Sequence, residues 1–152
     1  MNAALLARTR FALLASLALA FAFTSPVRAN VDDAHSFAME AAAPFVDQGF
    51  IVREDYWNGE VKSGQQLMIR HQLFKGNEYA FWLGTANDDC KLDIQVLDAN
   101  GKPIQIATKI GIGPTFTSVR VNPPATGSYT LIFSVTSKSE KAVFWALAYG
   151  YH

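Results

Sequence analysis

Hydrophobic and polar residues alternate along most of the chain from Tyr56 onward, with the period of two that is typical of β-strands. The segment Leu92–Val96 is the clearest example, because its apolar residues alternate with Asp93 and Gln95. We expect the apolar faces of all such segments to point into one core. In the other segments the inward faces consist of Leu67, Ile69, His71 and Leu73; Tyr79, Phe81 and Leu83; Val119 and Val121; Tyr129, Leu131, Phe133 and Val135; and Val143, Trp145, Leu147, Tyr149 and Tyr151.

Turn signals separate these segments. Lys75-Gly76-Asn77 predicts a hairpin between the strand that ends near Leu73 and the strand that begins at Tyr79. Asn100-Gly101 predicts a turn into a strand that contains Ile104 and Ile106. The chain thus has about eight short strands, spaced roughly 8–14 residues apart, which is typical of an antiparallel β-sandwich or a small barrel. No helix-length segment lies between the strands, which excludes a parallel α/β sheet.

A helix is expected before the strands. Apolar residues recur at spacings of three and four between Asp32 and Val46, which predicts one amphipathic helix. Asp32 or Asp33 could serve as its N-cap, and Pro44 and Gly49 limit its length. We expect this helical lead-in, residues 30–55, to cover one edge or end of the domain formed by residues 56–152.

The first 29 residues have the three parts of a secretory signal peptide. Arg8 and Arg10 precede the uncharged apolar run Phe11–Phe23, and the small-residue pattern Val27-Arg28-Ala29 predicts cleavage before Asn30. A spanning helix needs about 20 apolar residues, more than this run provides, so a membrane anchor is the less favoured interpretation. No cysteine near the predicted cut could carry a lipid. We therefore expect an exported protein, periplasmic or secreted.

Removal of residues 1–29 leaves 123 residues, a typical length for one domain. They carry 10 basic and 13 acidic residues, a net charge of −3, because Arg8, Arg10 and Arg28 are lost. Without a basic stripe, the composition argues against a nucleic-acid partner and against binding to anionic lipid. We expect a monomer.

Three motifs follow one another in the order found in a known family. They are Leu73–Tyr79 (LFKGNEY), Leu92–Gly101 (LDIQVLDANG) and Pro123–Tyr129 (PPATGSY). This order and spacing resemble the bacterial pre-peptidase C-terminal (PPC) domain and its stand-alone exported relatives, over roughly residues 56–150. The resemblance implies a jelly-roll-like β-sandwich that accompanies secreted enzymes and has no catalytic residues. Lys91 departs from the family pattern, and Cys90 lacks the second cysteine that some relatives carry, so we expect no disulfide in this loop.

No catalytic signature is present among the three histidines after residue 29, His35, His71 and His152. Cys90 and His71 could in principle form a nucleophile and a base, but they lack a third group that orients the base. His71 lies on an apolar strand face and is better interpreted as a core or edge histidine. We therefore expect no enzymatic activity.

An oxygen-rich segment could bind calcium. Asn87, Asp88 and Asp89 supply amide and carboxylate oxygens, which Ca²⁺ prefers. The alternative is that asparagine and aspartate form the turn by bonding their own backbone. We favour the turn and expect neither metal nor cofactor, and these three residues remain the candidates if a site exists.

Two further sets of residues are candidates for binding. An aromatic set could either be buried on both faces of a strand under the lead-in helix or form an exposed platform for a sugar or a protein. A second set could form a protruding loop, although the same residues also suit a turn that enters a strand. The aromatic set is Trp57, Trp82, Trp145, Tyr149 and Tyr151, and the loop set is Thr126, Gly127, Ser128 and Tyr129.

These observations favour a non-catalytic exported accessory module that contacts a protein or a cell-envelope polymer. The alternative is a periplasmic enzyme inhibitor or immunity-type protein that acts through the loop at Thr126. Cys90, the only cysteine, shares a strand face with Leu92 and follows Asp89. Burial and nearby carboxylates both raise a thiol pKa, so we expect an inert thiol and no disulfide-linked dimer.

Overall fold

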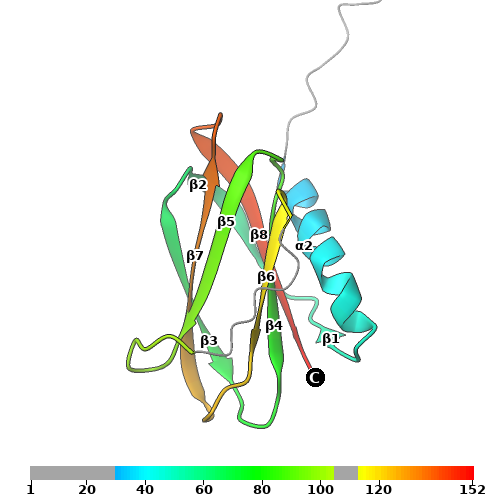
Figure 1. Cartoon of the computed structure of the whole chain (residues 1–152), viewed down its shortest axis with the longest axis vertical. Coiled ribbons are helices and arrows are strands. Elements are labelled where there is room, and N and C mark those ends of the chain that lie inside the picture. Colours follow the sequence, from blue (N-terminus) through cyan, green and yellow to red (C-terminus); the bar gives the residue numbers. More distant parts are fainter. Residues whose placement is uncertain (1–29, 105–112) are drawn as a thin grey trace, which may run out of the picture.

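The computed structural model describes residues 30–104 and 113–152, which form two antiparallel sheets and one helix (Figure 1). The sheets pack face to face, and the helix lies on the outer side of the larger sheet. This confirms the predicted all-β sandwich with an N-terminal helix. In chain order the elements are α2 (Val31–Val46), β1 (Ile51–Val52), β2 (Trp57–Lys62), β3 (Gln66–Leu73), β4 (Tyr79–Thr85), β5 (Cys90–Leu97), β6 (Phe116–Val121), β7 (Gly127–Ser137) and β8 (Ala142–Tyr151).

The larger sheet has the strand order β1-β8-β4-β6, and the smaller one has the order β3-β7-β5. β2 also pairs with β8, along Ala142–Leu147, while β1 pairs with the end of β8 at Gly150 and Tyr151. The predicted signal peptide and the predicted strand residue Ile106 lie outside the described residues. Within them, Pro103 forms an isolated bridge with Leu97. No helix of the described residues is long and apolar enough to cross a membrane.

The predicted hairpin between β3 and β4 is wrong. β3 pairs with β7, whereas β4 pairs with β6 and β8, so the turn at Gly76 carries the chain from one sheet to the other. Gly76 adopts a φ of 98°, which a glycine reaches without steric cost. The physical reason lies in β4, whose seven residues are all buried. Such a strand must lie in the interior of a sheet that is covered on both faces. β4 has this place between β8 and β6, whereas β3 lies at the edge of the smaller sheet.

The inner faces of both sheets form the main core, as the period-two pattern predicted. Along β7, Tyr129, Leu131, Phe133 and Val135 are all buried, and along β5 Ile94 and Val96 are buried. Val143, Trp145, Leu147 and Tyr149 of β8 complete this core from the larger sheet.

The helix covers the outer face of β4, and not one edge or end of the domain as predicted. It buries Trp82, as one interpretation of the aromatic set expects, whereas Trp145 and Tyr149 lie in the main core. Phe45 of α2 packs edge-on against Trp82 at 5.4 Å between ring centroids. Small residues let the helix approach closely, because Ala38 and Ala42 face Ala80 and Ala148 in a second core cluster.

The start of the helix differs from the prediction in its cap. Asn30, rather than Asp32 or Asp33, is the N-cap, and its side-chain oxygen accepts a hydrogen bond of 2.9 Å from the Asp33 backbone N–H. The Asp33 carboxylate in turn accepts from the Asn30 backbone N–H at 3.3 Å, which completes a capping box. Pro44 lies inside the helix instead of ending it.

At Gly84 of β4 the helix backbone lies directly against the sheet. A Cβ atom at this position would lie 2.2 Å from the Ala34 carbonyl oxygen and 2.5 Å from the Ala38 nitrogen. Both are main-chain atoms, which cannot rotate away as a flexible side chain can.

We therefore expect Gly84→Ala to move the helix off the sheet and to lower the free energy of unfolding by about 1–3 kcal/mol, the usual cost of overpacking. Chemical denaturation measures the change. Gly127→Ala is the matched control, because a Cβ there meets no atom within 4 Å. Equal effects of the two substitutions would contradict the proposed role of Gly84.

Leu131 tests the assignment of the inner core. Its side chain is fully buried, so Leu131→Ala should lower the free energy of unfolding by about 2–5 kcal/mol, the range for large-to-small core changes. Ile132→Ala is the control in the same strand, because Ile132 lies on the opposite, partly exposed face. A midpoint shift for Leu131→Ala no larger than that of the control would refute this core.

Candidate functional site

Two hollows open at opposite ends of the sandwich. His71 pairs across with Tyr129, near the start of β7, whereas Cys90 pairs with Ser137 at its end. Eight residues of extended strand separate these two positions, a distance of roughly 27 Å. Cys90 and His71 therefore cannot act on one substrate as nucleophile and base.

The first hollow, which we name the aromatic cleft, has a volume of about 350 Å³ and lies where the edge of β3 meets the ends of β4 and β8. Its lining combines aromatic side chains with a few polar groups. The lining residues are Arg53, His71, Gln72, Phe74, Asn77, Tyr79, Tyr149 and Tyr151.

Tyr149 is the centre of the aromatic cleft. Its ring lies edge-on to the His71 ring at 4.5 Å between centroids and tilted to Trp57 at 5.4 Å. Its hydroxyl donates a hydrogen bond of 2.9 Å to Asp55, whose carboxylate lies 3.5 Å from the Arg53 Nε. Burial and then the Asp55 carboxylate raise the pKa of Tyr149, so its hydroxyl stays protonated and keeps this hydrogen bond.

The three histidines occupy separate places. Burial lowers the pKa of His71, which agrees with its interpretation as a histidine packed at the edge of the core. His35 stacks on Tyr56 with 3.8 Å between ring centroids, and His152 lies against Phe50.

Phe74 stands on the rim of the aromatic cleft and is 53% exposed. Its backbone N–H donates to the Tyr79 hydroxyl at 3.1 Å, and the next N–H, of Lys75, donates to Thr126 Oγ1 at 2.9 Å. Two backbone hydrogen bonds between Glu78 and His152 hold the other end of this turn. The turn thus presents an apolar ring to solvent from a fixed backbone.

The predicted loop at Thr126 lies beside this turn, at the lower end of the molecule in Figure 1. Thr126 and Ser128 are exposed, whereas Tyr129 is buried and its hydroxyl donates to the Ala125 carbonyl at 2.7 Å. Gly127 begins β7 opposite Leu73. The loop set is therefore divided, with Tyr129 in the core and Thr126 and Ser128 at the surface.

The aromatic set does not form an exposed platform. Trp82, Trp145 and Tyr149 are buried, and Trp57 and Tyr151 are half-buried. Only Tyr149 and Tyr151 line the aromatic cleft. Arg53, Phe74 and Tyr79 were not among the predicted site residues, although Tyr79 was predicted on an inward strand face, where it is buried.

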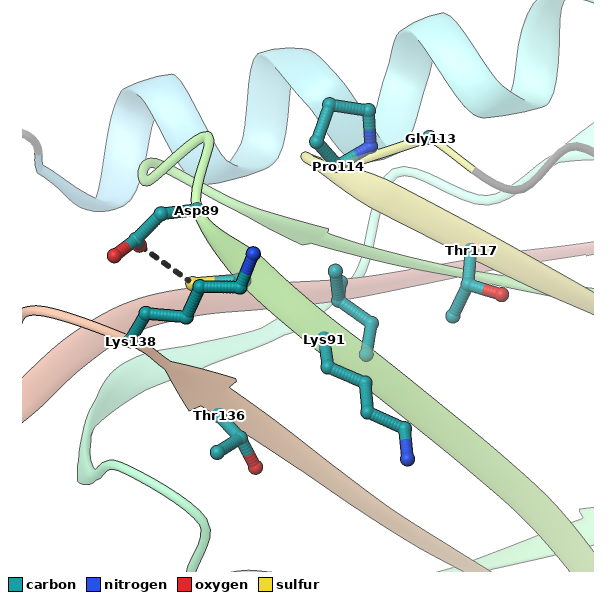
Figure 2. A pocket seen from close by; sticks show the side chains of 9 residues that line it. Asp89, Lys91, Gly113, Pro114, Thr117, Thr136 and Lys138 are labelled. Atoms are coloured by element: carbon teal, nitrogen blue, oxygen red, sulfur yellow. Dashed lines mark hydrogen bonds between the residues drawn. The ribbon is translucent and has the colours of Figure 1, made fainter.

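The second hollow, the β5–β6 hollow, has a volume of about 730 Å³ and lies between the edges of the two sheets (Figure 2). Lys91 and Lys138 extend over it, and Thr117 and Thr136 face it from strands of different sheets. None of the described residues that line it is aromatic. It consists of Asp89, Cys90, Lys91, Leu92, Gly113, Pro114, Thr117, Thr136 and Lys138.

Asp89 is a structural link at this end of the sandwich. Its carboxylate accepts hydrogen bonds from Ser137 Oγ at 2.9 Å and from the backbone N–H and hydroxyl of Ser139 at 2.9 and 2.7 Å. The bonds from Ser139 and then Ser137 lower the pKa of the Asp89 carboxyl. The carboxylate thus ties the turn before β5 to the end of β7, and not to its own backbone as the turn interpretation predicted. Within the described ranges, no group of three or more acidic, histidine or cysteine residues could hold a metal ion.

The Cys90 thiol is half-buried beside this carboxylate, as expected. Its sulfur lies 3.7 Å from Asp89 Oδ1, along the dashed line in Figure 2, and 4.0 Å from Thr85 Oγ1. Burial raises the pKa of the thiol, the hydrogen bond with Thr85 lowers it, and the charge of Asp89 raises it again, with a net increase.

The comparisons with known proteins place the chain in no family. No family model matches it, and no curated protein matches it. It is similar to the crystal structure of Aeromonas hydrophila PliG, a periplasmic lysozyme inhibitor of g-type lysozyme, with 16% identity and a TM-score of 0.47 over 69% of this chain and 90% of that chain. It is also similar to Bacillus licheniformis lipase BlEst2 in propeptide form, with 18% identity and a TM-score of 0.45 over 63% of this chain and 21% of the lipase.

Both TM-scores lie below 0.5, so the fold assignment depends on the strand pairing described above. Membership of the PPC family and export of the chain stay predictions.

The environment of Cys90 predicts that its thiol reacts slowly with thiol reagents. A raised pKa leaves less thiolate at neutral pH than in an unfolded chain, so native protein should react slowly with a thiol reagent and rapidly once denaturant is added. The labelling rate of native protein should rise only at a pH above the ordinary thiol range of about 8.5.

The control is Asp88→Cys combined with Cys90→Ser, which moves the thiol to an exposed position of the same turn. That variant should label rapidly without denaturant. If native Cys90 reacts as fast as this control, the thiol is not protected.

Proposed function

We propose that this chain is a non-catalytic module that binds a protein partner at the end of the sandwich formed by the aromatic cleft and the turn at Phe74. The observation that carries the proposal is the exposure of Phe74 on a turn whose backbone is held on both sides. A rigid, exposed aromatic side chain loses little conformational entropy on binding and is a typical anchor of protein interfaces.

The residue types around Phe74 support a protein partner. Tyrosine, phenylalanine and arginine are enriched at protein interfaces, and the half-buried Tyr151 and the exposed Arg53 line the cleft next to Phe74. The β5–β6 hollow has instead two lysines at its rim, and lysine is depleted at such interfaces.

A protein also fits better than an envelope polymer. Binding of a sugar by stacking requires an exposed ring face, but Tyr79 and Tyr149 are only 4% and 7% exposed. Both rings pack against neighbouring rings, Tyr149 stacked on Phe81 and Tyr79 tilted to Tyr151.

Enzyme inhibition is the second candidate. The exposed residues Thr126 and Ser128 lie beside the turn of Phe74, so an apolar anchor and a polar loop project from the same end of the molecule. Such a combination could seal the active-site cleft of an enzyme, with the loop inside it and Phe74 at its margin.

The test compares two exposed apolar positions on immobilised protein. We expect the unaltered chain, incubated with an extract of the cells that produce it, to retain one protein in stoichiometric amount. Phe74→Ser should lose at least 90% of that protein, roughly the effect of removing one anchor worth about 1.4 kcal/mol or more. Val46→Ser is the matched control, because Val46 is similarly exposed but lies on α2.

Equal retention by Phe74→Ser and Val46→Ser would refute the proposed site. Sedimentation with insoluble cell-wall material, dependent on Phe74, would show that the partner is a polymer and not a protein. Loss of a lytic activity of the extract in the presence of the unaltered chain would support the inhibitor candidate.

A further inference from the structure

The β5–β6 hollow has no part in the proposed function, and its inner wall is apolar surface that the core leaves partly exposed. Leu92 of β5 packs against the core opposite Val135 of β7, yet Leu92 is only partly buried, whereas Val135 is 1% exposed. Cys90, the neighbouring residue on the same strand face, is likewise half-buried. Pro114 adds apolar surface on the side of β6. With about 730 Å³, the hollow has the size of a typical site for a small molecule.

A buried hydroxyl lines this hollow without a hydrogen-bond partner. Thr117 of β6 lies on the inner face of its sheet, because it alternates with the core residue Val119, and only 3% of it is exposed. Its hydroxyl forms no hydrogen bond within the described residues, whereas the buried Thr85 hydroxyl of β4 donates to the Phe144 carbonyl at 2.9 Å. A buried hydroxyl without a partner is energetically unfavourable. Thr117 therefore offers an unused donor to a molecule in the hollow.

The rim of the hollow carries positive charge without a paired carboxylate. Lys91 and Lys138 extend over it in Figure 2, and neither forms an ion pair with another residue that the structure describes. Asp89 also lines the hollow, but its oxygens already accept hydrogen bonds from Ser137 and Ser139. Two lysines against one aspartate give the lining residues a net charge of +1.

We propose that the β5–β6 hollow binds a small amphiphilic anion, namely a carboxylate with a long apolar chain. This inference is independent of the proposed function, whose site lies at the opposite end of the sandwich. The apolar chain of the ligand lies along Leu92 and Pro114. Its carboxylate pairs with the ammonium groups of Lys91 and Lys138, and one carboxylate oxygen accepts a hydrogen bond from the Thr117 hydroxyl.

Other classes of ligand match the hollow less well. A cation is repelled by the two lysines. A sugar that binds by stacking needs an aromatic ring face, and the described lining offers none. A small inorganic anion leaves the apolar wall uncovered, and an uncharged apolar molecule leaves the lysines and the Thr117 hydroxyl without a partner. Only a ligand with both an apolar chain and an anionic head uses all three features.

Isothermal titration calorimetry of the mature chain with dodecanoate, below the concentration at which dodecanoate forms micelles, tests the proposal. We expect saturable binding of one dodecanoate per chain. Acetate has the same head group without the chain, and dodecylammonium has the same chain with the opposite charge. Neither should bind saturably.

Substitutions locate the binding in the hollow. Lys91→Glu combined with Lys138→Glu should raise the dissociation constant for dodecanoate at least about tenfold, because like charges then face each other. Lys75→Glu combined with Lys102→Glu is the matched control, at exposed lysines outside the lining, and should leave the dissociation constant nearly unchanged. Thr117→Val keeps the shape of the side chain and should raise the dissociation constant about two- to tenfold. It should not lower the free energy of unfolding, because no hydrogen bond within the described residues is lost.

The proposal is overturned if dodecanoate does not bind, if dodecylammonium binds as tightly, or if the two pairs of lysine substitutions weaken binding equally. Unchanged affinity of Thr117→Val contradicts it as well, because the ligand would then not contact the inside of the hollow. Binding to vesicles of anionic lipid without binding of monomeric dodecanoate would show that the lysines meet a membrane surface instead. Retention of a protein partner through Phe74 is measured separately, so its success or failure alters none of these outcomes.

Discussion

The burial of β4 on both of its faces is the constraint on which the rest of the structure depends. All seven residues from Tyr79 to Thr85 are buried, with Phe81 in the main core and Trp82 under the helix. A strand of this kind needs neighbours on both edges and cover on both sides. The central place between β6 and β8 supplies the neighbours, and α2 supplies the second cover, which Gly84 permits by its lack of a side chain.

The same constraint shapes the end of the molecule that we propose as the binding surface. Because β3 and β4 belong to different sheets, the turn between them crosses the open end of the sandwich and carries Phe74 to the surface. Arg120 of β6 stabilises this region. Its guanidinium lies about 5 Å from the rings of Phe45 and Phe50, and its Nε lies 3.5 Å from Glu78. The helix, β6 and the turn are thus connected through one cation.

Because the helix packs on one sheet, the two sheets differ in how far their outer faces are covered. The larger sheet has a covered outer face, whereas no helix among the described residues covers the outer face of the smaller sheet, and the inward residues Leu67, Ile69 and His71 of β3 are only partly buried. Polar links occur instead at its far end, where Asp89 joins the turn before β5 to Ser137 and Ser139. Hydrogen bonds within the chain thus hold the strands together beside the β5–β6 hollow, while the aromatic cleft lies at the opposite end of the sandwich.

The sequence by itself determined the strands β3 to β8, the single helix and the inward residues such as Leu131 and Ile94, because a period of two or of 3.6 is a local property of the backbone. It also indicated the environment of Cys90, because Asp89, its neighbour in sequence, is also its neighbour in space. Only the tertiary structure decided that β3 and β4 part into different sheets, that β3 lies at an edge, and that Phe74, Tyr79 and Arg53 meet at one cleft. Strand pairing joins residues far apart in the chain, and its free energy depends on what covers each face, which no local pattern contains.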